Sequence, residues 1–460
     1  MRQRTELHPP GVPVATDPPR RRPFAQTFRS LGHRDYRLWA GAAVVSNTGT
    51  WMQRVAQDWL VLVDLTADSA LAVGIVTGLQ FLPMVLLAPW AGLIADRFEK
   101  RRILQVSQSL QGLLALGLGV LVIAGLAQVW HVYVFALALG VVTAFDAPAR
   151  QTYVTSLVPP EDLPNAIGLN AATFHLGRLL GPASAGLLIA WVGSGPVFVL
   201  NAVSFGFTVV VLALTRSRSP GQGTQGLSGL ERMRQAVQYV RTRGDILLVL
   251  VLVFVVGTFG LNFQLTTAVM ARIEFDRGPE SYGLLGTFLA VGSLTGALAA
   301  AGRRRARLRL VVGAVTGFGV ASCVASLMPT YWSFAVSLVA VGLTALTLMT
   351  AANATVQLST PPELRGRVMA LYFAVFIGAT PVGAPLIGWI AEAWGARWTI
   401  AVGGITALLA AVGAVVFLAR RSTIEVRFRT DARPHVVMLT GPKGEGSDSS
   451  PHPTHDERVA

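Results

Sequence analysis

The stretch ILLVLVLVFVVGTFGLNFQLTTAVM, residues 246 to 270, decides the class of fold to which this chain belongs. It contains no charged side chain, and it exceeds the roughly 20 apolar residues that a helix needs to cross a bilayer. The same character extends over the whole chain, because 52% of its 460 residues are hydrophobic, only 13% are charged and the mean hydropathy is +0.53. A soluble domain carries about 25% charged residues. The sequence therefore predicts an all-α membrane protein.

Twelve stretches of comparable length and apolarity occur along the chain. Their approximate bounds are 38–63, 70–95, 103–125, 131–149, 165–191, 196–215, 246–270, 282–302, 310–327, 331–353, 367–392 and 396–419. Each is predicted to be a transmembrane helix, because lipid offers no hydrogen-bond partner to a backbone amide and a helix satisfies its amides internally.

The longest polar interruption divides these stretches six and six. We expect an N-terminal six-helix bundle at 31–216, a cytoplasmic linker at 217–245 and a C-terminal six-helix bundle at 246–420. The segments 1–30 and 421–460 are rich in Pro, Gly, Ser and charge. Such composition is typical of disordered tails, which we expect on the cytoplasmic side.

The formal net charge of +14 comes from basic residues that form short clusters between the apolar stretches. Such clusters mark cytoplasmic loops, so they predict orientation and do not indicate nucleic-acid binding. One side of the predicted membrane holds clusters such as Arg97–Arg102, whereas the other holds only Arg272, Arg277 and Arg397. We expect a multi-pass protein of the bacterial inner membrane with both termini in the cytoplasm.

The two halves of the chain resemble each other. A shift of about 202 positions places Pro159-Pro160-Glu161 on Pro361-Pro362-Glu363. The same shift pairs three glycines with three others: Gly140 with Gly342, Gly181 with Gly383 and Gly186 with Gly388. Parallel repeats are typical of alternating-access carriers, whose site lies between the halves near the midplane. The sequence therefore predicts two pseudo-symmetric six-helix bundles with a site between them.

The loop after the second stretch reads Gly92-Leu-Ile-Ala-Asp96-Arg97-Phe-Glu-Lys-Arg101-Arg102. Gly92 would permit close helix contact, and Asp96 could meet a helix N-terminus, where the backbone dipole favours negative charge. The pattern resembles the signature loop of the major facilitator superfamily. That resemblance implies the twelve-helix major facilitator fold and a cytoplasmic latch in which Asp96 faces Arg367; a plain positive-inside loop is the alternative.

The fifth stretch carries small residues at regular intervals, namely Gly168, Gly177, Gly181, Pro182 and Gly186. Glycines let helices approach closely, and a proline removes a backbone hydrogen bond and permits a bend. The spacing resembles the antiporter motif of drug:proton antiporters, with Ala185 in place of one glycine. Ordinary small-residue packing is the alternative.

Three further stretches narrow the resemblance. They are Phe145-Asp146-Ala147-Pro148-Ala149-Arg150-Gln151, Val158-Pro159-Pro160-Glu161 and Pro362-Glu363-Leu364-Arg365-Gly366-Arg367. Over roughly 28–420, the chain is similar to the enterobactin-exporter (transmembrane secretion effector) type of major facilitator proteins. That resemblance implies export of a drug, antibiotic, siderophore or other secondary metabolite.

Charged residues inside the predicted helices are the first candidates for chemistry, because each costs about 2.5–3.5 kcal/mol at the bilayer centre. Arg54 and Asp58 share one face of the first stretch. Asp58 is the candidate proton carrier, with Arg54 holding it ionised in one state; an ion pair that only fixes the helix end is the alternative. His175 is a further proton candidate, or a neutral packing residue. We expect both Asp58 and Arg178 to face the central cavity.

Arg178 could bind an anionic substrate or pair with a carboxylate of another helix. Weaker cavity candidates are the polar residues Asn47, Gln80, Asn170, Asn262, Gln264 and Thr347. Trp51 and Trp59 are predicted to anchor the protein at the membrane interface.

The candidate cytoplasmic gate consists of Gly92, Asp96, Arg97, Arg101, Asp146, Arg150, Arg365 and Arg367. Asp146 is expected to form a gating ion pair with Arg150 or with the loop of Arg97; proton carriage is the alternative. Its repeat counterpart is Leu348, so the two halves differ at this position.

Motifs for other chemistry are absent from the sequence. There is no Gly-x-x-x-x-Gly-Lys-Ser/Thr phosphate loop, no His-Glu-x-x-His pair and no Gly-x-Ser-x-Gly in a strand-to-helix context,. The single cysteine, Cys323, excludes disulfides and cysteine-built metal sites. We therefore expect a transporter and not an enzyme, without cofactor or metal.

The predicted function is export of a small organic molecule by proton antiport and alternating access. The proton gradient would supply the energy, and the partners would be the substrate and the lipid bilayer, with the protein working as a monomer. Two alternatives stay open: a proton-coupled uptake symporter of a small metabolite, and a membrane-embedded receptor.

Overall fold

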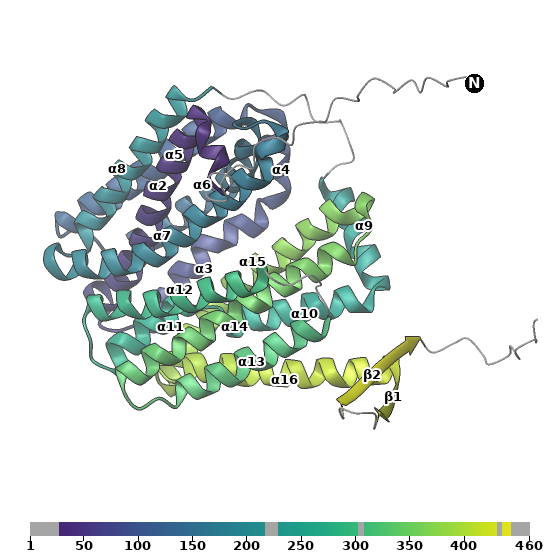
Figure 1. Cartoon of the computed structure of the whole chain (residues 1–460). Coiled ribbons are helices and arrows are strands. Elements are labelled where there is room, and N and C mark those ends of the chain that lie inside the picture. Colours follow the sequence, from purple (N-terminus) through teal and green to yellow (C-terminus); the bar gives the residue numbers. More distant parts are fainter. Residues whose placement is uncertain (1–26, 217–228, 302–307, 430–434, 443–460) are drawn as a thin grey trace, which may run out of the picture.

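The computed structural model describes residues 27–216, 229–301, 308–429 and 435–442, and its fold is helical (Figure 1). The helices of the first half are α2 (Arg34–Trp59), α3 (Ala70–Leu86), α4 (Ala88–Arg97), α5 (Lys100–Ile123), α6 (Val129–Tyr153), α7 (Leu163–Val192) and α8 (Ser194–Leu214). The later helices are α9 (Gly229–Thr242), α10 (Gly244–Phe259), α11 (Phe263–Val269), α12 (Pro279–Ala301), α13 (Leu308–Ser326), α14 (Tyr331–Leu358), α15 (Pro362–Trp394) and α16 (Trp398–Arg421). Short helical turns are η1 (Arg29–Gly32), η2 (Leu60–Leu65), η3 (Val154–Ser156), η4 (Pro160–Asp162) and η5 (Met270–Glu274).

Among the described residues, nine helices are long and apolar enough to cross a membrane, and α3 is a shorter apolar helix. Large apolar side chains such as Leu113, Val203, Leu298 and Val412 are more than half exposed. An exposed apolar surface of this extent is unfavourable in water, but it matches lipid. The prediction of an all-α membrane protein is confirmed.

Two predicted stretches are not single helices. The stretch 70–95 is divided at Leu87 between α3 and α4, because Pro89 at the start of α4 has no N–H to continue the hydrogen-bond ladder,. The stretch 246–270 ends its first helix at Phe259 and resumes at Phe263. There, a Cβ on Gly260 would lie 2.6 Å from the ring of Phe318, so this break brings the backbone close to α13.

The helices run between two ends of the molecule that differ in charge. We call one the arginine-rich end. It holds α9, the turn 98–99, the segment 154–162 and the turn 359–361, together with the arginines that flank these turns, such as Arg97, Arg101, Arg150 and Arg365. The opposite, arginine-poor end holds the connections 66–69, 193, 275–278, 327–330 and 395–397.

Each half packs mainly on itself. In the first half, α2 contacts α7 and α8, and α6 contacts α3 and α5; in the second, α14 contacts α12 and α13, and α16 contacts α10 and α13. The most extensive contacts between the halves are those of α7 with α12 and of α3 with α15. Figure 1 shows these four helices at the boundary between the halves.

The predicted linker and tails are partly structured. Residues 1–26, 217–228, 430–434 and 443–460 lie outside the described residues, but α9 occupies the second part of the linker and contacts α4 and α15. The C-terminal segment, expected to be disordered from 421, contains an antiparallel hairpin of β1 (Ser422–Arg429) and β2 (His435–Pro442). Alternating Ile424, Val426 and Phe428 give β1 a strand period of two,, which the overall tail composition concealed.

Candidate functional site

A cavity of about 470 Å³ lies between the halves and is lined by α2, α3 and α7 on one side and by α10, α11, α12, α14 and α15 on the other. Small-molecule sites typically measure about 300–1,000 Å³. Four predicted cavity residues line it: Asn47, Arg178, Asn262 and Gln264. Gln80, Asn170 and Thr347 are not among the lining residues.

The wall from the first half is cationic and aromatic. The guanidinium carbon of Arg54 lies 5.0 Å from the ring centroid of Trp51 and 5.5 Å from that of Phe81. The guanidinium carbon of Arg178 lies 5.6 Å from the same Trp51 centroid. Phe174 meets Trp51 edge-on, with centroids 5.8 Å apart. The prediction that Trp51 anchors the membrane interface is therefore wrong, because its ring lines the cavity between two arginines.

The wall from the second half is polar without charge. Asn262, Gln264, Thr267 and Ser293 line it together with apolar residues. Asn262 donates its amide to the Thr258 carbonyl at 2.7 Å, while its Oδ1 atom is buried and has no partner among the described residues. This oxygen is a free acceptor at the edge of the cavity.

Asp58 does not line the cavity, contrary to expectation. Its side chain is 4% exposed, and it accepts a hydrogen bond of 3.0 Å from the Tyr282 hydroxyl of α12. Tyr282 itself lines the cavity and stacks on Trp59 with centroids 6.3 Å apart. No ion pair joins Asp58 to Arg54 in the part of the chain that the structure describes. Asp58 thus links the two halves just beyond the cavity.

Further polar contacts join the halves at the arginine-poor end. Arg272 donates to Asp68 at 3.0 Å. Glu392 of α15 accepts from the Ser69 hydroxyl at 2.6 Å and from the Leu71 backbone amide at 3.1 Å, so it caps the N-terminus of α3 with a favourable charge. Together with Tyr282, these residues hold that end closed.

The two helix pairs between the halves meet through glycines. A Cβ on Gly186 would lie 2.5 Å from the Pro279 carbonyl oxygen, and one on Gly283 would lie 2.2 Å from that of Pro182. In the repeat-related pair, a Cβ on Gly388 would lie 2.5 Å from the Ala70 carbonyl oxygen. These contacts leave no room for a side chain.

The predicted glycine motif of α7 is largely a packing surface. Beside Gly186, Gly177 and Gly181 abut α2, because a Cβ there would lie 2.8 Å from Asn47 and 2.5 Å from Trp51. Gly168 has nothing within 4 Å. The prediction of a close-packing face is confirmed for three of the glycines, and Pro182 lies between their two contact surfaces.

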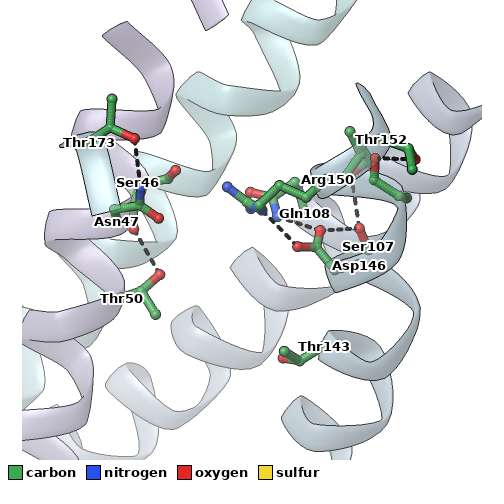
Figure 2. Close-up of polar contacts among 12 residues, drawn as sticks. Ser46, Asn47, Thr50, Ser107, Gln108, Thr143, Asp146, Arg150, Thr152 and Thr173 are labelled. Atoms are coloured by element: carbon green, nitrogen blue, oxygen red, sulfur yellow. Dashed lines mark hydrogen bonds and ion pairs between the residues drawn. The ribbon is translucent and has the colours of Figure 1, made fainter. Parts of the chain in front are cut away.

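Asp146 stands in a buried hydrogen-bond network (Figure 2). Its carboxylate accepts from Ser107 at 2.6 Å, from Gln108 at 2.8 Å and from Arg150 at 2.9 Å. The predicted pair with Arg150 is therefore present. All of these residues belong to α5 and α6, so the network joins helices of one half and does not bridge the two halves.

The other gate candidates lie at the arginine-rich end. Arg101 donates to the Leu212 and Ala213 carbonyls at 2.6 and 2.7 Å and caps α8, while Arg97 and Arg365 are exposed. Arg367 donates to Gln235 of α9. The side chain of Asp96 lies outside the described part of the chain. A Cβ on Gly92 would meet nothing within 4 Å, so the expected close contact there is not present.

His175 and Thr347 take packing positions, whereas Asn47 lines the cavity and also makes a contact with α7. His175 lies edge-on to Phe174, with centroids 5.9 Å apart, and is not in the cavity lining. Asn47 donates to Thr173 at 3.2 Å (Figure 2). The Thr347 hydroxyl is buried without a partner among the described residues.

Sequence reasoning missed Tyr282, Glu392 and Asp68. Each lies at the end of a predicted stretch or in a short connection, where polar residues are common. For Glu392, the available signal was a carboxylate one turn after Gly388, on a helix whose repeat counterpart carries Ala190 at that position.

A cavity between two helical halves of a membrane protein, closed at one end by contacts from both, defines a membrane transporter. Comparison with known proteins agrees. Residues 25–435 match the family described as transmembrane secretion effectors, so the chain belongs to this family of major facilitator transporters. It is not an enzyme.

Relatives of known name are transporters. The chain is 28% identical over 400 residues to the multidrug efflux pump Tap of Mycolicibacterium fortuitum, covering 84% of this chain and 96% of Tap. It is 24% identical to the staphyloferrin A transporter of Staphylococcus aureus, covering 54% of this chain and 62% of that protein. The fold is similar to an inward-facing bacterial homologue of the lysosomal transporter Spinster, with a TM-score of 0.61, 16% identity and coverage of 83% and 95%.

Proposed function

We propose that the protein exports a small organic molecule across the bacterial inner membrane by proton antiport. The observation that carries this proposal is the cavity between the halves, sealed at the arginine-poor end by residues of both. The efflux named for Tap supports the direction. The twelve predicted stretches, taken as twelve transmembrane helices in two bundles, give the protein the even number of spans that places both termini on one side.

The arginine-rich end is assigned to the cytoplasm, because cytoplasmic loops of bacterial membrane proteins are enriched in Arg and Lys. The described conformation then has its external end closed. Alternating access requires the contacts of Tyr282, Arg272 and Glu392 to separate while the arginine-rich end closes. The protein is proposed to work as a monomer.

Asp58 is the proposed proton site, because it is a carboxylate buried in a contact between the halves that alternating access would have to separate. With the external end closed, it is buried against Tyr282 without an ion pair. Burying a charged carboxylate without a cationic partner costs several kcal/mol, and a proton removes that charge. External opening would give Asp58 access to the external protons, and external closure would bury the carboxyl group and so favour its protonated form. Release of the proton to the cytoplasm would follow when Arg54 approaches and favours the ionised form.

Proton-coupled uptake is the second candidate function, and the position of Arg54 favours it. Asp58 lies one helical turn from Arg54. A proton on Asp58 neutralises its negative charge and so makes the cavity beside Arg54 more positive. A proton and a negatively charged substrate would then bind together, which is the linkage that symport needs.

The two functions are separated by the sign of proton-driven flux in inside-out vesicles. The probes are sulforhodamine B, a net anion, and rhodamine B ethyl ester, a net cation on the same xanthene ring. A pH gradient is imposed with the lumen acidic, and potassium with valinomycin holds the membrane potential at zero. We expect dye to accumulate in the lumen, and Asp58→Asn to abolish accumulation while downhill equilibration persists.

Net movement out of preloaded vesicles under the same gradient would establish symport instead. If the flux of both dyes is the same with and without the pH gradient, proton coupling is contradicted. Arg37→Gln, a change at an exposed residue of α2, controls for expression and insertion.

A further inference from the structure

We propose that the substrate is an amphipathic organic anion whose negative group binds between Arg54 and Arg178 beside Trp51. This inference deepens the proposed transport function and rests on it; because a proton on Asp58 and an anion at Arg54 would favour each other's binding, it supports the symport candidate over antiport. It follows from two guanidinium groups that line one cavity whose described lining contains no acidic residue.

The charge balance of the cavity is the first step. Arg54 and Arg178 both line it, and none of the described residues in the lining is Asp or Glu. The nearest acid along α2, Asp58, lies outside the lining, accepts from Tyr282 and forms no ion pair with Arg54 among the described residues. Two like charges next to each other in a low-dielectric site repel, and a cation within the membrane normally has a partner. A ligand anion would supply the missing charge.

The hydrogen-bond capacity of the two arginines is the second step. No hydrogen bond or ion pair of either guanidinium group is found within the part of the chain that the structure describes, and the Arg54 Nε atom is buried without a partner. Both groups instead lie against the ring of Trp51. Contact with an aromatic ring uses no hydrogen-bond donor of the guanidinium, so the N–H groups that reach the cavity remain for a carboxylate, sulfonate or phosphate.

The rest of the cavity fits an apolar body with a hydrogen-bond donor. Phe81, Phe174, Leu261, Phe263 and Phe376 form apolar walls. On the opposite wall, the side-chain amides of Asn262 and Gln264 belong to the lining, and an amide oxygen can accept from a hydroxyl or amide N–H. The complementary ligand therefore carries an acid at one end, aromatic or aliphatic bulk between, and a donor at the other end.

The charge of the ligand has a consequence for transport. Movement of an organic anion out of a cell that is negative inside is favoured by the membrane potential. Export of such a substrate would be electrogenic and would draw on the potential as well as on the proton gradient.

Equilibrium binding to purified protein in neutral detergent tests this inference without any gradient. Fluorescence anisotropy measures the affinities of sulforhodamine B and rhodamine B ethyl ester for the wild type, Arg54→Gln, Arg178→Gln, Arg178→Lys and the exposed control Arg37→Gln. We expect the anion to bind wild type more tightly than the cation. Each glutamine variant should weaken anion binding about tenfold, the loss of one charge-assisted contact, and should narrow the preference over the cation. Arg178→Lys and Arg37→Gln should retain that preference.

Equal affinity of wild type for both dyes would overturn the inference, and so would anion binding that is unchanged in both glutamine variants. If Arg54→Gln does not fold, two comparisons still test the inference: the affinities of the wild type for the two dyes, and the affinity of Arg178→Gln against that of Arg178→Lys for the anion. Binding of the anion without proton-driven flux would refute the transport proposal only, whereas proton-driven flux of the cation alone would refute the anion inference only.

Discussion

The two walls of the cavity occupy equivalent places in the internal repeat but carry different chemistry. The shift of 202 positions places Phe174 on Phe376 and Arg178 on Thr380, and all four residues line the cavity. The aromatic position is kept and the charge is not. Both arginines of the lining belong to the first half. Duplication thus accounts for the scaffold and the shape of the cavity, whereas the chemistry is specific to one half.

Unlike the cavity walls, the contacts between the halves are alike at repeat-related positions. Gly186 and Gly388 are related by the same shift, and each meets a carbonyl oxygen of the other half at a distance that excludes a Cβ. Substitutions at repeat-related positions should therefore have equal effects at the contacts between the halves and unequal effects in the cavity.

The largest effect on transport is expected when a side chain is introduced at Gly186 or Gly388. Gly186→Leu and Gly388→Leu should each reduce dye flux at least about tenfold, because overpacking costs about 1–3 kcal/mol in the state in which the external end is closed. Gly206→Leu, at a glycine with nothing within 4 Å, is the matched control. Full flux in either contact variant would show that the contact is dispensable.

The second-largest effect on transport should distinguish the two walls of the cavity. Arg178→Gln should lower gradient-driven flux of sulforhodamine B about tenfold, the value of one charge-assisted hydrogen bond. Thr380→Ala, at the repeat-related position, should change it less than about twofold. Initial rates in inside-out vesicles measure both, and similar losses in the two variants would contradict an asymmetric cavity.

A smaller effect is expected within the first half, where Asp146 replaces the leucine of the repeat. Asp146→Asn should lower the free energy of unfolding by about 1–3 kcal/mol, because it leaves Arg150 without its charged partner. Thermal unfolding in detergent measures this as a reduced Tm. The same change at the exposed Asp276 should cost less than about 0.5 kcal/mol, and an equal Tm for both variants would refute the importance of the network.

The smallest effect is expected at the arginine-poor end. Arg272 and Asp68 are 34% and 39% exposed, and an ion pair of this kind contributes about 0.2–1 kcal/mol. Arg272→Gln should therefore shift the population toward external opening by about fivefold at most. Distances between spin labels at Ala124→Cys and Ala393→Cys, in a Cys323→Ser background, report that population. A complete shift would mean that the pair dominates closure.

The sequence predicted the features that depend on local composition. Apolar length predicts transmembrane helices, and the glycine spacing of α7 predicts close packing, because both depend on residues near each other along the chain. The breaks at Leu87 and Gly260 were missed, because apolar runs do not reveal where a helix is interrupted.

The polar contacts of the site depend on residues far apart in sequence. Tyr282 lies 224 residues from Asp58, and Glu392 lies 323 residues from Ser69. Hydropathy cannot pair such positions. Trp51 was expected at the interface from its position in the stretch, but its direction depends on how α2 packs against α7, through Gly177 and Gly181.

Cross-linking the external end tests alternating access most directly. Ser69→Cys and Glu392→Cys, in a Cys323→Ser background, place thiols at positions whose side chains are in contact across the halves. A short, reversible bifunctional thiol reagent would then tie α3 to α15. Gradient-driven dye flux should stop on cross-linking and return when a reductant releases the link. Flux that continues at the original rate in fully cross-linked protein would contradict opening at this end.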